Sequence, residues 1–254
     1  MSNKLATKKV VVSLRHFRMD FGPKIVIKDL SFDVYKGEVF GLLGSNGCGK
    51  TTAIRALLGL YQPTGGELLV DGKPFSVSSG IKLGYLPEER GLYKKESVID
   101  VMLYFGQLKG LSRDDARKRA EAYLERVKLS DKINARIDKL SGGQQQKIQL
   151  GITIINDPEL LILDEPTKGF DPVNRRLLMD IIEEHQRNGA TVIFVTHQME
   201  EVERLCDRIV LLKDGVARAY GTVKEVKKEF NGASLDDIFI KIYGDENEKT
   251  EEDR

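Results

Sequence analysis

The sequence is short of three things: it has no tryptophan, only two cysteines and no long run of apolar residues. Two cysteines, Cys48 and Cys206, do not make a disulfide framework, so we expect a reduced, cytosolic setting. A membrane-spanning helix needs roughly 18 consecutive apolar residues. No run reaches that length, so another chain would have to supply any membrane span. The polar start, Met1–Lys4, predicts no secretory signal.

Charge of one sign is also lacking, because 40 Lys and Arg nearly balance 39 Asp and Glu for a net charge of +1. No overall field therefore draws the protein towards nucleic acid or anionic lipid, and we expect no nucleic-acid partner. A chain of 254 residues can form one large domain or a core with a subdomain.

Hydrophobic periodicity indicates a mixed α/β chain. Short apolar runs bounded by turn residues predict strands at 8–14, 25–35, 38–43, 67–70, 160–163 and 191–195. Helical spacing predicts helices over 50–60 and 141–155, and a change to Ala, Arg, Glu, Lys and Leu predicts a mainly helical insertion at about 98–127. The charged tail, 245–254, is expected to be disordered.

A glycine-rich loop, Gly44–Thr51, joins the strand at 38–43 to the helix at 50–60. Its glycines let the backbone turn tightly and point N–H groups inward, which makes an anion cradle at the helix N-terminus. Lys50 should reach the β- and γ-phosphates of a nucleotide, and the Thr51 hydroxyl should ligate Mg²⁺. A chance glycine turn is the alternative. The residues expected to contact the nucleotide here are Gly44, Ser45, Asn46, Gly47, Cys48, Gly49, Lys50, Thr51 and Thr52.

Two carboxylates, Asp164 and Glu165, follow the apolar run at 160–163. Alternation along a strand would point them in different directions. Asp164 is expected to hold Mg²⁺, directly or through water, and Glu165 to polarise the water that attacks the γ-phosphate. The alternative is a pair of solvated acids at a strand end.

A second glycine motif, Ser141–Gln144, lies where a helix is predicted to begin, 91 residues after Lys50. In a single copy it could be only a helix cap with flexible glycines. Leu140–Gln144, at this distance from the glycine loop, resembles the signature of the nucleotide-binding subunit of an ATP-binding cassette (ABC) transporter. The resemblance covers nearly the whole chain, and Leu160–Pro166 completes the family's Walker B pattern.

The resemblance implies an α/β fold: a P-loop NTPase (RecA-like) core with an N-terminal antiparallel β subdomain and an inserted α-helical subdomain. We expect the ATPase domain to span 1–225, with the helical subdomain at about 88–157. A short helical extension at 226–244 and the tail at 245–254 would follow.

The resemblance also assigns roles to single residues. Phe21 matches the aromatic residue on which the family stacks adenine, although it could instead be a core phenylalanine, and Val26 matches a smaller contact. His197 matches a histidine that contacts the γ-phosphate, and Asp171 a loop that communicates across a dimer interface. In this family the signature closes on a nucleotide held by a second subunit. The signature residues expected to act in that way are Ser141, Gly142, Gly143 and Gln144.

One position departs from the common family pattern. Glu88 lies in Gly84–Arg90, a loop that usually has Gln after its proline. A carboxylate can still ligate Mg²⁺ but adds negative charge near the γ-phosphate. The Pro-Glu-Glu-Arg-Gly sequence here resembles an exporter-type subset that includes sodium-extrusion ATPase subunits, and Gly169–Pro172 and Ser234–Phe239 also resemble exporter subunits.

The helical region after Glu88 is expected to face a transmembrane partner. Its apolar residues could form a docking groove or belong to the subdomain core. These residues are Tyr93, Val98, Val101, Met102, Tyr104 and Phe105.

The resemblance therefore predicts an ATP- and Mg²⁺-dependent ATPase that drives export through a separate membrane permease without touching the cargo. It would act as a homodimer or heterodimer, cytoplasmic and peripheral on the inner face of the membrane. The alternative is a non-transport ABC ATPase that switches a membrane or soluble partner. Ser141 follows Lys50 by 91 positions, a distance too short for the long heptad insertions of chromosome-maintenance relatives.

Overall fold

The computed structural model describes residues 8–74, 80–89 and 91–244. The tail at 245–254, expected to be disordered, and Arg90 lie outside the described residues. The chain forms two compact units, one made of Met1–Gly80 with Thr191–Arg254 and the other of Ile81–Ala190.

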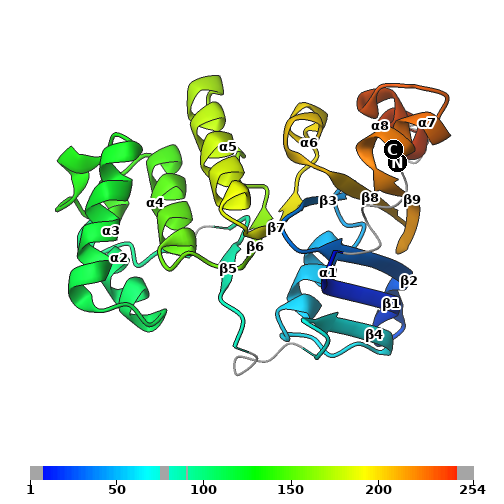
Figure 1. The fold of residues 1–254 in the computed structure, drawn as a ribbon, viewed down its shortest axis with the longest axis horizontal. Coiled ribbons are helices and arrows are strands. Elements are labelled where there is room, and N and C mark those ends of the chain that lie inside the picture. The colour runs from blue at the N-terminus through cyan, green and yellow to red at the C-terminus, as the bar shows by residue number, and fades with distance from the viewer. Residues whose placement is uncertain (1–7, 75–79, 90, 245–254) are drawn as a thin grey trace. The chain divides into compact units, whose positions relative to one another are not determined.

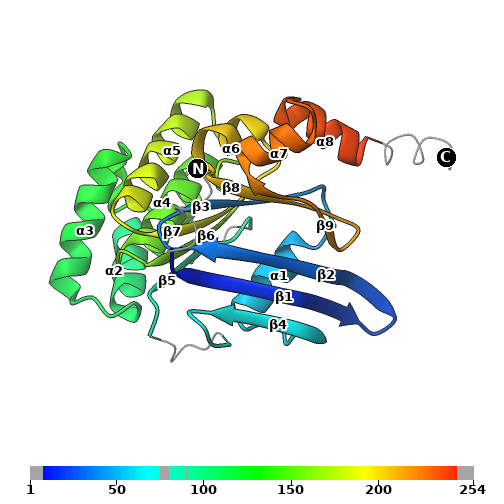
Figure 2. The same cartoon turned by 45° about the vertical axis from the view of Figure 1, so that its right-hand side comes forward.

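The first unit begins with an antiparallel layer of three strands, which Figure 2 shows as neighbouring arrows. The strands are β1 (Val10–Phe21), β2 (Lys24–Tyr35) and β4 (Gly65–Val70). Their core side chains include Val12, Leu14, Phe17 and Met19 of β1. β1 continues past the end of the predicted strand at 8–14. The sequence pattern ends early because the backbone at His16, with φ 46°, shifts the register and interrupts the alternation. The predicted antiparallel β layer is thus present.

The same unit continues into a parallel group around β3 (Val39–Leu43), all of whose residues are buried. β3 lies between β7 (Thr191–Val195) and β8 (Arg208–Lys213), both parallel to it, and β9 (Val216–Thr222) is antiparallel to β8. The strand order within this unit is β4-β1-β2-β9-β8-β3-β7. Its helices are α1 (Lys50–Leu57), α6 (Met199–Leu205), α7 (Val223–Glu229) and α8 (Leu235–Tyr243).

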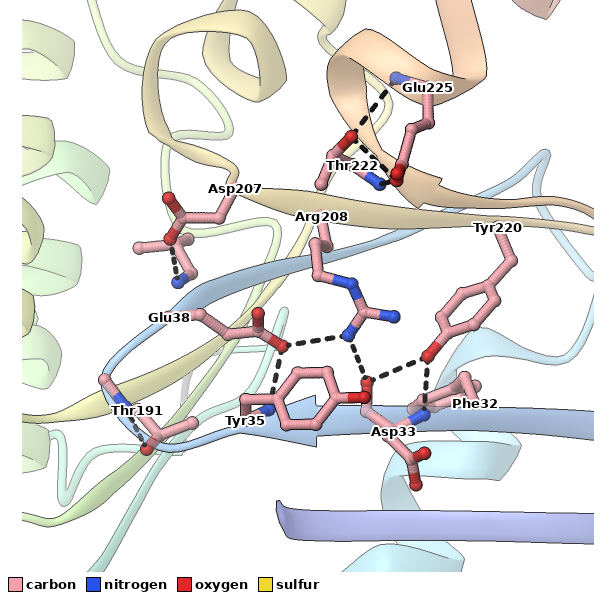
Figure 3. Close-up of polar contacts among 12 residues, drawn as sticks. Phe32, Asp33, Tyr35, Glu38, Thr191, Asp207, Arg208, Tyr220, Thr222 and Glu225 are labelled. Carbon is pink, nitrogen blue, oxygen red and sulfur yellow. Dashed lines mark hydrogen bonds and ion pairs between the residues drawn. The ribbon is translucent and has the colours of Figure 1, made fainter. Parts of the chain in front are cut away.

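A buried polar cluster joins the strands of this unit at the start of β8 (Figure 3). The Arg208 guanidinium lies 4.7 Å from the ring centres of both Tyr35 and Tyr220. It donates to the Asp33 carbonyl at 3.0 Å and pairs with Glu38 at 3.4 Å. Burial raises the pKa of the Glu38 carboxyl, while Arg208 acts in the opposite direction. Because removal of one partner would leave a buried charge, the cluster fixes how these strands meet.

The second unit combines two parallel strands with a group of helices, labelled α2 to α5 in Figure 1. The strands are β5 (Leu83–Leu86) and β6 (Leu160–Asp164), with Leu86 opposite Leu163. The helices are α2 (Val98–Leu108), α3 (Arg113–Arg126), α4 (Gly142–Ile154) and α5 (Pro172–Arg187), with 3-10 turns at Ser130–Lys132 and Ile137–Lys139. The insertion predicted at 98–127 is helical, as α2 and α3.

Helix α4 is fastened to α2 and α3 at several points. Lys109, at the end of α2, donates to the carbonyl oxygens of Ile152 and Thr153 near the end of α4, at 2.8 and 2.7 Å. Burial lowers the pKa of the Lys109 ammonium to about 8. The Tyr123 hydroxyl of α3 donates to the Lys147 carbonyl at 2.7 Å. The bonds from Lys109 satisfy carbonyls that a helix end leaves without intrahelical partners, and together with the Tyr123 bond they join the three helices.

Within the described residues, no helix is both long and apolar enough to cross a membrane.

Candidate functional site

The glycine loop Gly44–Gly49 follows β3 and leads directly into α1, as the sequence predicts. Gly49 is the N-cap of α1 at φ 111°, a left-handed conformation that glycine adopts without strain. Within the described part of the chain, no side chain caps this helix. The first N–H groups of a helix have no intrahelical acceptor, so this end presents donors to an anion.

Close packing also requires glycine at the start of the loop. A Cβ atom on Gly44 would lie 2.6 Å from the Leu212 carbonyl oxygen and against the Cys48 sulfur. Cys48 is buried, its sulfur lies against Gly44, and it also lines the cavity beside the loop, so its contact with a nucleotide stays a prediction. Any larger residue at Gly44 would displace the loop.

Lys50 is buried at the first position of α1. Its ammonium donates to the carbonyl oxygens of Gly44 at 2.7 Å and Ser45 at 2.9 Å. The cation is therefore held inside the loop by neutral acceptors, which a more strongly charged phosphate oxygen could replace. Thr51 and Thr52 are half-buried on the same first turn.

A cavity of about 450 Å³ opens beside this loop. Val26 lines it, and the Val26 side chain lies 3.5 Å from the position of a Cβ on Gly49. The structure thus brings Val26 and the glycine loop together. The other lining residues are Lys24, Ile25, Lys28, Ser45, Asn46, Gly47, Cys48, Thr52, Asp214 and Gly215.

Phe21 lies at the end of β1 and is 43% exposed, so the alternative of a core phenylalanine is wrong. The ring edge contacts Tyr61, with centroids 5.2 Å apart at 78°. Tyr61 is itself bonded to Arg55 of α1 at 3.1 Å. Phe21 does not line the cavity beside the glycine loop. Adenine stacking on Phe21 stays a prediction.

Asp164 and Glu165 lie at the carboxyl end of β6 and are 3% and 5% exposed. The alternative of two solvated acids is therefore wrong. Asp164 ends the strand, whereas Glu165 already lies in the following turn at φ 48°. Because Glu165 lies beyond the end of β6, the strand alternation expected from the sequence does not apply to this pair. Left-handed backbone at a non-glycine residue costs about 1–2 kcal/mol and is concentrated at functional sites.

Glu88 lies on the loop after β5 and forms an ion pair that sequence reasoning missed. The Lys168 ammonium donates to its Oε1 at 2.6 Å. This contact raises the pKa of Lys168 and keeps the ammonium charged. Since Glu88 and Lys168 are 80 residues apart in sequence, no local pattern could have revealed the pair.

His197 follows β7 and is exposed in the segment before α6. β7 and β3 are adjacent and parallel, with Val195 opposite Leu42, so His197 and the glycine loop leave the same edge of this sheet. The neighbouring Thr196 is fully buried, and its hydroxyl bonds to Glu201 at 3.1 Å. The residue before His197 is thereby fixed.

The signature Ser141–Gln144 starts α4, as predicted. Ser141 is the N-cap, and its hydroxyl oxygen accepts from the Gln144 N–H at 3.3 Å. The Gln144 side-chain oxygen accepts from the Ser141 N–H at 2.9 Å, which completes a capping box. The helix-cap interpretation of these residues is thus correct at the structural level, and a role with a second subunit remains a prediction.

Asp171 caps α5, with its carboxylate accepting from the N–H groups of Val173 and Asn174 at 2.9 Å each. These bonds, first of all the one from Asn174, lower the pKa of Asp171. Its role at a dimer interface stays a prediction.

Two buried glutamines of α4 were missed by the sequence analysis. Gln146 donates to the Pro166 carbonyl at 3.1 Å, and Gln149 donates to the Glu89 carbonyl at 3.2 Å. The signal that could have found them is the presence of two amide side chains on an otherwise apolar helix face.

The residues after Glu88 divide between the two roles that the sequence left open. Val98, Val101 and Met102 are fully buried and belong to the core of the second unit. Tyr93 and Tyr104 are about half exposed, and with Phe105 they form a cluster whose ring centroids lie 5.3 to 6.0 Å apart.

The residues expected to bind magnesium fit that ion chemically. Thr51, Glu88 and Asp164 would supply only oxygen ligands, which Mg²⁺ prefers, and Mg²⁺ is commonly held by one or two carboxylates with substrate phosphates. Among the described residues, no group of three or more His, Cys, Asp or Glu could hold a metal ion by itself. The buried carboxylate of Asp164 is the strongest candidate.

Comparison with known proteins is consistent with this geometry. The model of the ABC transporter family matches residues 27–168. An uncharacterised ABC transporter ATP-binding protein of Methanocaldococcus jannaschii is 44% identical over 86% of this chain and 80% of its own length. The Nod factor export ATP-binding protein I of Cupriavidus pinatubonensis is 37% identical over 93% and 72%. The linearmycin resistance ATP-binding protein LnrL of Bacillus subtilis is 35% identical over 89% and 73%.

A solved structure of the ATP-binding subunit of an ABC transporter superimposes with a TM-score of 0.83 at 28% identity. The superposition covers 91% of this chain and 98% of the chain in the solved structure. The fold predicted from the sequence is therefore confirmed, whereas the predicted domain boundaries stay predictions. The chain belongs to the ABC transporter family, as an ATP-binding subunit.

Proposed function

We propose that this subunit hydrolyses ATP to power the export of a substrate through a separate membrane permease. The observation that carries the proposal is the uncapped start of α1, where Gly49 leaves the helix donors open and Lys50 lies buried within the loop. Export is supported by the relatives named for Nod factor export and linearmycin resistance. The permease would carry the cargo, and this chain would not touch it.

In this proposal, separate sets of residues bind the phosphates, the adenine and Mg²⁺ and activate the water. The glycine loop, Lys50 and Thr52 bind the phosphates, and Phe21 and Val26 bind the adenine end. Thr51, Asp164 and Glu88 hold Mg²⁺, which neutralises phosphate charge when bound. Glu165 accepts a proton from the attacking water, because its buried carboxylate lies directly after the magnesium-binding residue.

A second subunit would complete each site. Ser141–Gln144 of one subunit would close on the γ-phosphate held by the other, since the start of α4 is electropositive. His197 would contact the γ-phosphate, and Asp171 would lie at the interface between the subunits. ATP binding would close the dimer, and hydrolysis with product release would reopen it and move the permease.

The test is Glu165→Gln, which preserves the size of the side chain and removes its basicity. We expect ATP binding to persist and turnover to fall by a factor of about 10²–10⁴. Binding is measured with a fluorescent ATP analogue and turnover by phosphate release. Hydrolysis close to the wild-type rate would show that Glu165 is not the base.

The matched control is Glu159→Gln. Glu159 is exposed and directly precedes β6, whereas Glu165 directly follows it, so the control lies at the opposite end of the strand from the proposed chemistry. Its replacement should leave turnover unchanged. ATP-dependent substrate movement in vesicles containing the membrane partner would separate transport from a role as a switch.

A further inference from the structure

The Glu88–Lys168 ion pair connects two loops that leave the same edge of the β5–β6 pair. Leu86 and Leu163 lie opposite each other in parallel strands, so the segments that follow them are neighbours. Lys168 lies in the turn that begins at Glu165, and its N–H donates to the Glu165 carbonyl at 3.2 Å. The pair therefore links the residue that departs from the family pattern to the turn that carries the proposed base.

Both loops are fastened to the same helix. Gln149 of α4 donates to the Glu89 carbonyl, next to Glu88, and Gln146 donates to the Pro166 carbonyl, two residues before Lys168. The two glutamines are 7% and 4% exposed, so these bonds lie inside the unit. With both backbones fixed, the ion pair can open by rotation of two exposed side chains while the loops stay in place.

We infer that Lys168 is a positioning residue that holds the Glu88 carboxylate until Mg²⁺–ATP binds and then releases it to the metal ion. The inference rests on the proposed function. A glutamate where the family commonly has neutral glutamine adds one negative charge, which would repel the γ-phosphate. Lys168 offsets that charge in the nucleotide-free protein.

The strength of the pair suits an exchange of partners. The side chains of Lys168 and Glu88 are 60% and 43% exposed. Exposed ion pairs change an equilibrium by a factor of about five at most, so loss of the pair would weaken Mg²⁺ binding only slightly. The three donors and flexible stem of lysine allow it to turn aside, which a planar guanidinium in a bidentate contact would resist.

The test is a double-mutant cycle of Lys168→Met and Glu88→Gln, with Glu165→Gln present throughout to prevent turnover. The apparent affinity for Mg²⁺ is measured by titrating the ion into protein with a fluorescent ATP analogue. We expect Lys168→Met to raise the Mg²⁺ affinity when Glu88 is intact. This change should be about two- to fivefold larger than the change that Lys168→Met causes in the Glu88→Gln background. Equal shifts in the two backgrounds, or no shift in either, would overturn the inference.

Lys94 provides a matched control. It lines the same open cavity of about 720 Å³ as Glu88 and Lys168 without belonging to the pair. Lys94→Met should shift the Mg²⁺ affinity equally in both backgrounds. If Lys94 instead showed a coupling with Glu88 as large as that of Lys168, the change in Mg²⁺ affinity would come from general electrostatics, which would contradict the inference. Failure of the parent protein to bind Mg²⁺–ATP would contradict the proposed function as well, whereas binding without coupling contradicts only the role of Lys168.

Discussion

Helices α1 and α4 both begin with glycine-rich sequences, but their first turns are built in different ways. α1 starts at a left-handed glycine, Gly49, with no side-chain cap. α4 starts at Ser141 with a complete capping box. The capping box satisfies two backbone N–H groups at the start of α4, whereas no side chain among the described residues caps the start of α1. The two proposed roles, a loop that holds the phosphates and a helix start that meets them only when a dimer closes, match these different constructions.

Other helices of the protein show what is special about the start of α4. In α2, α3 and α8 the capping serine also donates its hydroxyl proton to an aspartate three residues later, as Ser112 does to Asp115 at 2.6 Å. In α4 that position is Gln144, whose oxygen takes the backbone N–H of Ser141 instead. The first turn of α4 contains no acidic residue, so in the proposed function the serine hydroxyl could donate to a phosphate without a neighbouring carboxylate to repel it.

The largest effect is expected when a variant with a defect before α1 is combined with a variant that has a defect at the start of α4. Lys50→Met disables the loop before α1, and Ser141→Ala disables the start of α4, so each variant alone should be inactive. If the two motifs act across a symmetric dimer, mixing the variants restores one intact site in each mixed dimer. Roughly a quarter of wild-type activity should then return, measured as phosphate release at equal total protein.

Two observations support or contradict that expectation. Mixtures that stay inactive after unfolding and refolding together would show that both motifs act within one molecule. Wild-type activity per molecule should also fall on dilution below the dimerisation range, and a constant value would likewise show that one molecule is sufficient.

A smaller effect is expected from Gln144→Glu, which makes the start of α4 resemble that of α3. A glutamate in the first turn preserves the capping box and should raise stability slightly, by about 0.3–1 kcal/mol. It should nevertheless lower ATPase activity by a factor on the order of 10², because the carboxylate can take the Ser141 proton and repel phosphate. Chemical denaturation and phosphate release measure the two effects.

The control for this change lies in α3. Asp115→Asn removes the acid from an equivalent cap and should alter stability with no loss of activity, because α3 has no expected contact with nucleotide. Full activity in Gln144→Glu would mean that the Ser141 hydroxyl is not used by the phosphate.

The smallest effect concerns the glycines themselves. Gly49→Ala should lower the free energy of unfolding by about 1–2 kcal/mol, since alanine is strained at φ 111°. Its Cβ would also lie 3.1 Å from Ile27. Gly143→Ala should cost little, because helical backbone favours alanine and the added Cβ meets only Phe170 at 3.3 Å. Urea denaturation compares them, and equal losses would show that the two glycines are held alike.

The sequence predicted best where chain-local patterns decide the structure. β7 has the predicted bounds, and α4 begins at the predicted serine because capping is a local interaction. The helix predicted to Leu60 ends at Leu57, since Gly59 turns left-handed at φ 72°. β8 was not predicted, although the apolar run at 209–212 before Asp214-Gly215 carries the signal of a buried strand and turn.

Contacts between distant segments could not be predicted. The pairing of Glu88 with Lys168 depends on the register of β5 against β6, which no single-sequence pattern specifies. The positive φ of Glu165 likewise arises from the way the chain leaves β6 and not from its residue type. The predicted chemistry lies in recognisable motifs, whereas the contacts that position it come from tertiary structure.

The fastening of α4 at its C-terminal end and in its middle has a mechanical consequence. Lys109 and Arg119 donate hydrogen bonds to carbonyl oxygens at its C-terminal end. From its middle, Gln146 and Gln149 donate to carbonyl oxygens of two loops. Thirteen helical residues span about 20 Å. We therefore expect α4 to move together with α2 and α3, so that a displacement of either helix also displaces Ser141 at the start of α4.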